Sequence, residues 1–258
     1  MKIIATSTFL QAKALFLRNH LYAYEGMRLK FIWHFVMPCL PVILYNALNY
    51  LGIFASTGDG VPRALIISFG ITFYLVFSES IVGCTNCLEL NKSYINKTGL
   101  DIIPCYVSIV FAVLMSFSIR FLALLVALIF YAEYYTFNLL YAPILALSII
   151  IFGVSIGSML SIFATFYRDL TNFVQMMAFY LLFASGVFGF IDATTTIGKF
   201  VTVLPSYIYV TFSRSVVLGY QEINSSGFIY LVIISFVLFV FAMYLQRNAK
   251  SIILNHLK

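Results

Sequence analysis

The sequence predicts an all-α polytopic membrane protein with six transmembrane helices, an N-terminal amphipathic interface helix and a re-entrant helical pair before the last span. Hydrophobic residues make up 62% of the 258 residues and charged residues only 9%, and the mean hydropathy is +1.01. A soluble domain of this length could not bury so much apolar material. Six apolar runs divide the chain, each about as long as the roughly 20 residues that a helix needs to cross a bilayer. They are residues 31–54, 64–83, 104–131, 141–166, 173–191 and 228–246.

The polar segments between these runs are short, so we expect one membrane domain over residues 1–258 and no separate catalytic domain. The expected parts are an interface helix within 1–30, spans one to five within 31–191 with a coupling loop at 84–103, a re-entrant periplasmic segment at 192–227, span six at 228–246 and a cytoplasmic tail at 247–258.

The basic residues predict the orientation. With a cytoplasmic N-terminus, eleven Lys and Arg residues lie inside, three lie outside, and Arg120 lies within a span. Because Lys and Arg concentrate in cytoplasmic segments, both termini are expected in the cytoplasm. Residues 1–30 lack a basic start followed by a small-residue cleavage site, so we do not expect a removable signal peptide. The net charge of +6 is then explained by topology and anionic lipid headgroups, without a nucleic-acid partner.

The first element is expected to be a helix on the cytoplasmic membrane surface. Its apolar stripe recurs at steps of four and three residues. The stripe consists of Leu10, Ala14, Leu17, Leu21 and Tyr24. Docking against a partner subunit is an alternative to lipid contact.

Residues 84–101, between the second and third spans, are polar and interleave apolar side chains with Glu89, Lys92 and Lys97. This pattern predicts a short cytoplasmic helix that ends near Gly99. A simple connection could be shorter, so we expect a surface that touches another protein, with an inert loop as the alternative.

The four cysteines do not predict a metal site. Cys84 and Cys87 have C-x-x-C spacing, but no second pair or nearby histidine completes a zinc site. We expect no bound metal, and free thiols on the reducing side.

Residues 197–204 and 207–218 are apolar pieces on either side of Pro205, and each is too short to cross a bilayer. They predict a re-entrant or interfacial helix pair. Such backbone is tolerated where it is buried in protein or lines a cavity, so the segment is a candidate lip of a pathway. An outer-leaflet anchor is the alternative.

Arg214 is an exposed cation in this prediction, held beside Tyr207 and Tyr209 on the outer side. It is expected to contact a passing chain, or to pair with Asp192 or Glu222 as a latch.

Glu79 and Arg120 are charged residues inside apolar runs. Each would cost about 2.5 to 3.5 kcal/mol at the bilayer centre, so each should face a cavity or a polar partner. Counted along the expected spans, they lie roughly 10 Å and 25 Å from the cytoplasmic ends. A direct pair is therefore not expected, and Arg120 either lines the pathway or snorkels outward.

Several short motifs follow one another in a particular order. They are Arg18, then Gly26-Met-Arg-Leu-Lys-Phe-Ile-Trp33 and Pro38, then Phe166-Tyr-Arg168-Asp169, then Leu204-Pro205 with Arg214. In this order they resemble the permease subunit of polysaccharide-exporting ABC transporters, with the capsule-export branch nearest and O-antigen export permeases related. The chain departs from the capsule pattern at Asn19 and Met37, where acidic residues often stand.

The resemblance implies a transporter subunit and not an enzyme. The chain has no G-x-x-x-x-G-K-[ST] motif to hold nucleotide phosphates, so ATP and Mg²⁺ are expected on a separate ATPase subunit and no cofactor on this chain. The implied assembly is a homodimer with two ATPase copies in the bacterial inner membrane. Its implied substrate is a capsular or O-antigen-type polysaccharide, with periplasmic or outer-membrane export proteins as further partners.

The resemblance also suggests roles for particular residues. Those expected to couple to the ATPase are Glu89, Lys92, Tyr94, Arg168 and Asp169, and Asp169 is also expected to cap the fifth span. Those expected in the substrate pathway or gate are Arg120, Tyr207, Tyr209 and Arg214, since sugar rings stack on aromatic faces. Two alternatives stay open. One is a related ABC permease for a drug, glycolipid or teichoic-acid-like polymer, and the other is an ion-coupled carrier with Glu79 as its coupling acid.

Overall fold

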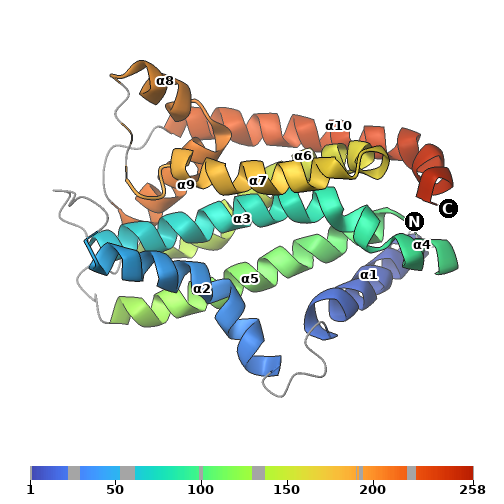
Figure 1. Ribbon diagram of the computed structural model, residues 1–258, viewed down its shortest axis with the longest axis horizontal. Helices are drawn as coiled ribbons and strands as arrows, with labels where there is room; N and C mark the ends of the chain where they lie inside the picture. The colour runs from blue at the N-terminus through green and yellow to red at the C-terminus, as the bar shows by residue number, and fades with distance from the viewer. Residues whose placement is uncertain are drawn as a thin grey trace.

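The computed structural model describes residues 2–22, 30–52, 62–98, 101–129, 137–189, 191, 194–219 and 225–257. All regular structure in these ranges is helical (Figure 1). The elements are α1 (Lys2–Phe16), the π-helical turn η1 (Leu17–Leu21), α2 (Lys30–Tyr50), α3 (Arg63–Leu90), α4 (Lys92–Thr98), α5 (Ile103–Ile129), the 3₁₀ turn η4 (Phe137–Tyr141), α6 (Ala142–Phe166), α7 (Asp169–Ala184), α8 (Thr196–Thr202), α9 (Pro205–Leu218) and α10 (Ser225–Leu257).

Four helices are long and apolar enough to cross a bilayer: α3, α5, the stretch Asn138–Phe166 that contains α6, and α10. The pair α8 and α9, bent by 74° at a short break, could form a fifth crossing. The predicted first and fifth spans are also helices, but they fall short by this measure. The apolar part of α2 is Phe35–Leu48, and α7 has only 16 residues. The described residues thus form an all-helical structure with four or five helices long and apolar enough to cross a membrane.

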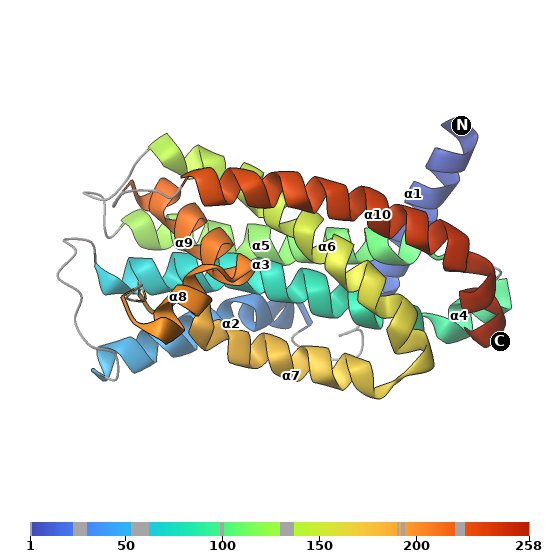
Figure 2. The ribbon, with the colours of Figure 1, turned by 90° about the horizontal axis from the view of Figure 1, so that it is seen from above.

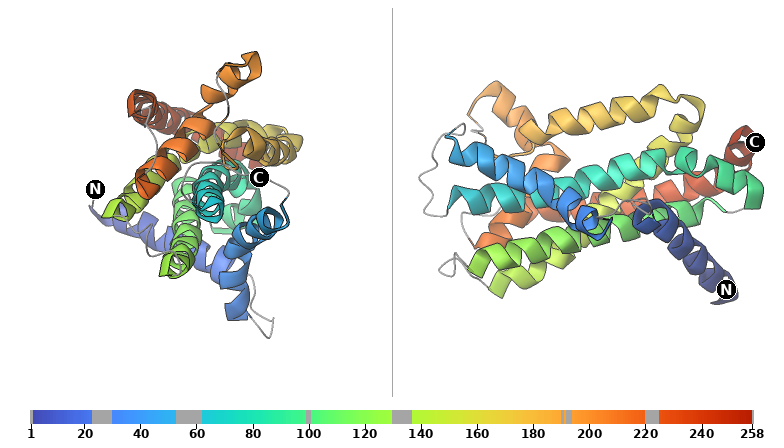
Figure 3. Two further views of the ribbon diagram at one scale, coloured as in Figure 1. Left: turned by 90° about the vertical axis from the view of Figure 1, so that its left-hand side faces the viewer. Right: turned by 60° about the horizontal axis from the view of Figure 1, so that its bottom comes forward.

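Helix α3 lies at the centre of the bundle. It packs against α2, α5, α6, α7 and α9, and the end-on view shows it surrounded by them (Figure 3). The most apolar window of α3 is 72% buried, whereas that of α10 is 17% buried. The exposed side of α10 is apolar and is therefore suited to contact with lipid. Helix α3 is surrounded by other helices and is suited to contact with protein.

Small residues let α3 and α6 approach closely. Gly153 and Gly157 of α6 form a G-x-x-x-G pair, the spacing that brings helix backbones together in membranes. A Cβ atom at Gly157 would lie 2.6 Å from the carbonyl oxygen of Ile81, and one at Gly153 would meet the Cβ atom of Ser80. Only glycine fits this contact, which fixes α6 against the centre of α3.

The bundle has two distinct ends. The beginning of α1, the end of α10 and helix α4 lie at one end, here named the α4 end, and α8 lies at the opposite, α8 end (Figures 1 and 2). The chain therefore begins and ends on the same side of the bundle.

The predicted apolar stripe of the first helix is not the face that packs on the rest of the bundle, and its last member, Tyr24, lies outside the described residues. Leu10 is 59% exposed, whereas Ala12 and Leu15 are buried. The helix packs obliquely on α5 (Figure 3), where the rings of Phe9 and Phe16 contact Phe111, with centroids 5.5 Å and 6.2 Å away. Aromatic rings contribute a large buried area, so the face that brings two of them to α5 is the one that docks.

Candidate functional site

Glu79 of α3 and Arg120 of α5 form a bidentate ion pair inside the apolar bundle. Nη1 of Arg120 donates to Oε1 of Glu79 at 2.6 Å, and Nη2 donates to Oε2 at 2.9 Å. Paired bonds of this kind are among the strongest that side chains form. The ion pair joins two helices that are 41 residues apart at this point.

The expectation that these residues could not pair was wrong for two physical reasons. Helix α3 continues to Leu90, well past the expected span end at Gly83, so Glu79 lies roughly 16 Å from the end of its helix and not 10 Å. In addition, each Cα–Cβ bond leans toward the N-terminus of its own helix. Because α3 and α5 run in opposite directions, the side chains of Glu79 and Arg120 lean toward each other.

The two partners differ in exposure. The Arg120 side chain is 0% exposed and the Glu79 side chain is 33% exposed. The carboxylate half of the pair therefore faces open space, while the guanidinium half is enclosed by protein.

Glu79 borders two adjoining cavities between the central helices and α2. Their volumes are about 580 Å³ and 260 Å³. The two cavities share the lining residues His20, Glu79, Ala112 and Ser116. A third cavity of about 440 Å³ is lined by Arg120 together with α8-end parts of α2, α3 and α5. The ion pair thus stands between the first two cavities and the third.

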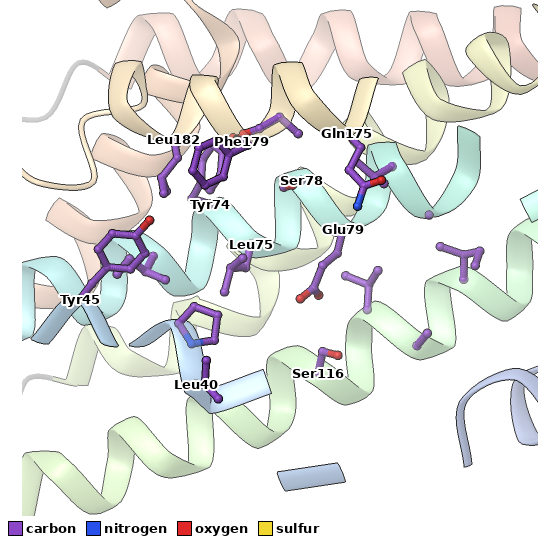
Figure 4. A pocket seen from close by; sticks show the side chains of 18 of the residues that line it. Leu40, Tyr45, Tyr74, Leu75, Ser78, Glu79, Ser116, Gln175, Phe179 and Leu182 are labelled. Carbon is purple, nitrogen blue, oxygen red and sulfur yellow. Dashed lines mark hydrogen bonds between the residues drawn. The ribbon is translucent and has the colours of Figure 1, made fainter. Parts of the chain in front are cut away.

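The cavity of about 580 Å³ lies among α2, α3, α5 and α7. Its wall is mainly apolar with a few polar groups, the usual make-up of a ligand pocket. Figure 4 shows the Glu79 carboxylate directed from α3 toward α5, with Ser116 across from it and Gln175 on α7. Aromatic rings of Tyr45, Tyr74 and Phe179 line the same cavity.

At the α4 end, two predicted coupling residues are in contact. Nε of Arg168, in the turn between α6 and α7, lies 2.5 Å from Oε1 of Glu89 near the end of α3. Lys250 of α10 pairs with Asp101, which precedes α5, at 2.9 Å. The Arg168 side chain is 86% exposed, so its ion pair contributes little stability and remains available to a partner.

Asn91 lies between α3 and α4 and bonds to side chains of η1. This residue was not singled out from the sequence. It is fully buried, and its Oδ1 accepts hydrogen bonds from Arg18 at 2.5 Å and Asn19 at 3.1 Å. Its own amide donates to the carbonyl oxygen of Cys87, and the Arg18 guanidinium lies over the ring of Tyr94 at 4.7 Å. These contacts tie η1, α3 and α4 together.

Of the three remaining predicted coupling residues, Tyr94 is partly buried, and Lys92 and Asp169 are exposed at this end. Lys92 opens α4, and Asp169 is the first residue of α7. The expected capping hydrogen bond is absent, since Arg168 occupies the N-cap position with helical dihedral angles and no side-chain cap. Asp169 therefore acts on α7 only through its charge in the first turn, where the helix dipole favours an anion.

Arg214 is buried, and the expectation of an exposed gate cation was wrong. Its side chain is fully enclosed, and Nη1 donates to the carbonyl oxygens of Gly186 at 2.7 Å and Val187 at 3.1 Å. These carbonyls follow the end of α7, where a cation is favoured by the helix dipole. Asp192 and Glu222, the latch partners suggested by the sequence, lie outside the described residues.

The two gate tyrosines are also buried. Tyr209 donates its hydroxyl proton to the carbonyl oxygen of Leu231 at 3.3 Å, and the Tyr207 oxygen accepts from the amide of Ile191 at 3.3 Å. Both rings thus hold α9 to neighbouring segments within this chain.

The four cysteines are free, with Cys84, Cys87 and Cys105 buried and Cys39 partly exposed. Over the described ranges, no group of three or more His, Cys, Asp or Glu side chains could hold a metal ion.

No model of a known protein family matches the chain, and no curated protein matches its sequence. The fold and the site define an all-helical protein with helices long and apolar enough to cross a membrane, an ion pair inside the bundle and adjoining cavities beside it.

Proposed function

We propose that the chain is the transmembrane permease subunit of an ATP-driven exporter that moves a capsular or O-antigen-type polysaccharide across the bacterial inner membrane. The observation that carries this proposal is the α4 end. There, Glu89 at the end of α3 pairs with Arg168 in the turn between α6 and α7, Lys250 of α10 pairs with Asp101 before α5, and Arg18 of η1 bonds to Asn91 before α4. A chain without a phosphate-binding loop must receive the energy of ATP from a partner, and a linked surface of this kind is suited to such a partner.

In this proposal the protein crosses the membrane six times. Helices α2 and α7 join the four longer helices as spans, and α8 and α9 form a re-entrant pair. Helix α7 is roughly 24 Å long, shorter than the hydrocarbon core of about 30 Å, which tilting or local thinning of the bilayer accommodates. The α4 end, which carries Arg18, Lys92 and Arg168, then faces the cytoplasm.

A second copy of the chain completes the pathway in this proposal. Cavities of about 580 Å³ and 260 Å³ hold a small ligand and not a polymer. The larger of these two cavities is bordered by exposed apolar residues of α2 and α7, including Leu40, Leu44 and Phe179. Two such faces brought together would enlarge the cavities into a channel.

The proposal is tested by isolating the tagged chain from membranes in mild detergent together with its ATPase subunit. We expect ATP hydrolysis in the purified complex and ATP-dependent movement of polysaccharide after reconstitution in vesicles. Replacement of Asn91 by Ala should separate η1 from α4 and reduce both activities, whereas Lys199→Ala, at the α8 end, should not. A purified chain that binds no ATPase would contradict the proposal.

One observation favours a second candidate, an ion-coupled carrier. The Glu79 carboxylate is partly exposed to a cavity inside the bundle, as a coupling acid would be. Transport driven by an ion gradient without ATP would support this candidate over the exporter.

A further inference from the structure

The ion pair presents only its acceptor half to the two adjoining cavities. Glu79 is 33% exposed and lines both, while the guanidinium of Arg120 is enclosed. An ionised carboxylate has about four positions at which its oxygens accept hydrogen bonds. Arg120 occupies two of them, so the remaining positions accept donors from a ligand in the cavity.

The charge balance of the pair disfavours charged ligands of either sign. A cation in the cavity would meet a carboxylate already neutralised by a guanidinium less than 3 Å away. An anion would meet the carboxylate first and be repelled. Hydroxyl groups donate to a carboxylate without carrying charge, and these bonds are stronger than those between neutral groups.

The other side chains of the cavities carry little charge. Ser78, Ser116 and Gln175 are uncharged, and apart from Glu79 no Asp, Glu, Lys or Arg among the described residues lines either cavity. Tyr45, Tyr74 and Phe179 supply aromatic faces, which suit the apolar C–H faces of a sugar ring.

From these features we infer that the adjoining cavities bind an uncharged, hydroxyl-rich sugar unit, which donates hydroxyl hydrogen bonds to Glu79. The inference rests on the proposed function and narrows its substrate to a polymer with neutral sugar units.

Trp33 provides a native probe of this site. It is the only tryptophan of the chain, and it lines the smaller cavity that shares Glu79 with the larger one. The purified chain in lipid nanodiscs is titrated with three disaccharides: maltose, which is neutral, digalacturonic acid, which is anionic, and the glucosamine dimer, which is cationic. Trp33 fluorescence is measured, and equilibrium dialysis of the radiolabelled sugars gives the binding directly. We expect maltose to bind at least about tenfold more tightly than either charged disaccharide, which is about 1.4 kcal/mol.

Two variants separate ligand contact from folding. Glu79→Gln leaves the charge of Arg120 uncompensated, so maltose binding should fall several-fold and digalacturonate binding should rise. The exchanged double variant, Glu79→Arg with Arg120→Glu, keeps an ion pair between α3 and α5 but removes the acceptor from the cavities. It should fold, and it should bind maltose at least about tenfold more weakly. Asn46→Ala, in the third cavity, is the matched control and should bind maltose normally.

The inference is overturned if a charged disaccharide binds as tightly as maltose, if the exchanged variant binds like the unaltered protein, or if neither measurement detects any disaccharide. Because the chain is tested without its ATPase, these outcomes are independent of ATP-driven export, which is decided by the purified complex.

Discussion

Replacing Arg214 by Ala should destabilise the protein strongly, because this arginine holds the end of α7 from inside the bundle. Nη1 bonds two carbonyl oxygens, those of Gly186 and Val187. Hydrogen bonds that involve a charged group contribute about 1.5 to 3 kcal/mol each, so the loss of both amounts to roughly 3 to 6 kcal/mol. The favourable interaction of a cation with a helix C-terminus, up to about 2 kcal/mol, is lost as well.

The assay is thermal unfolding of the purified chain in detergent, followed by circular dichroism. For a chain of this size, 1 kcal/mol corresponds to roughly 2 to 4 °C, so the midpoint should fall by at least about 6 °C. Arg214→Lys should recover part of the loss, since an ammonium group can still reach one carbonyl. An Arg214→Ala protein that unfolds at the original temperature but exports nothing would refute this reasoning and restore the gate role.

Three further predictions concern contacts between helices. Glu79→Gln should destabilise the fold by about 3 to 5 kcal/mol, because the fully buried charge of Arg120 is left unpaired, and Arg120→Gln should cost less, because Glu79 is 33% exposed; unchanged thermal midpoints would contradict this. Glu89→Arg should lower ATP-dependent export by repelling Arg168, and adding Arg168→Glu should restore it; export assays in vesicles decide, and an inactive double variant would show that the pair does not act as a unit. Gly157→Ala should cost about 1 to 3 kcal/mol because the new methyl group meets the carbonyl oxygen of Ile81; normal unfolding in guanidinium would mean that α6 can shift without penalty.

The sequence predicted helices well where hydropathy alone determines them. The second, third, fourth and sixth apolar runs became α3, α5, the α6 stretch and α10. Their ends were less predictable, because hydropathy measures preference for lipid and not whether a helix continues. Helix α3 runs on to Leu90 since its last turns pack on protein, as the buried Cys87 and Leu88 show.

The candidate site was predictable only in part. Glu79 and Arg120 were recognised as unusual, since charges inside apolar runs need a partner. Their pairing depends on how far α3 extends and on how two antiparallel helices align. Counting residues along a single helix gives neither of these. The G-x-x-x-G pair of α6 was not singled out from the sequence, although its spacing is the kind of signal that indicates close helix packing.

Long-range polar contacts left no local signal. Asn91 bonds to Arg18, 73 positions earlier, and nothing in the polar segment around Asn91 distinguishes it from its neighbours. Arg214 was judged from its place in an outer loop, whereas the carbonyls it binds belong to the end of α7. Burial of a polar group is a property of the assembled bundle, so it cannot be read from one segment.

Helix α10 runs from the α8 end of the bundle to the α4 end as one continuous helix (Figure 2). Its 33 residues contain no proline and extend roughly 50 Å, about 20 Å more than the hydrocarbon core. One end is held at the α4 end by the Lys250–Asp101 pair, and near the other the Tyr209 hydroxyl bonds to Leu231. A tilt of about 5° around the midpoint would move each end by about 2 Å in opposite directions. If the helix moves as one body, a displacement at the α4 end reaches α9, which packs beside its start.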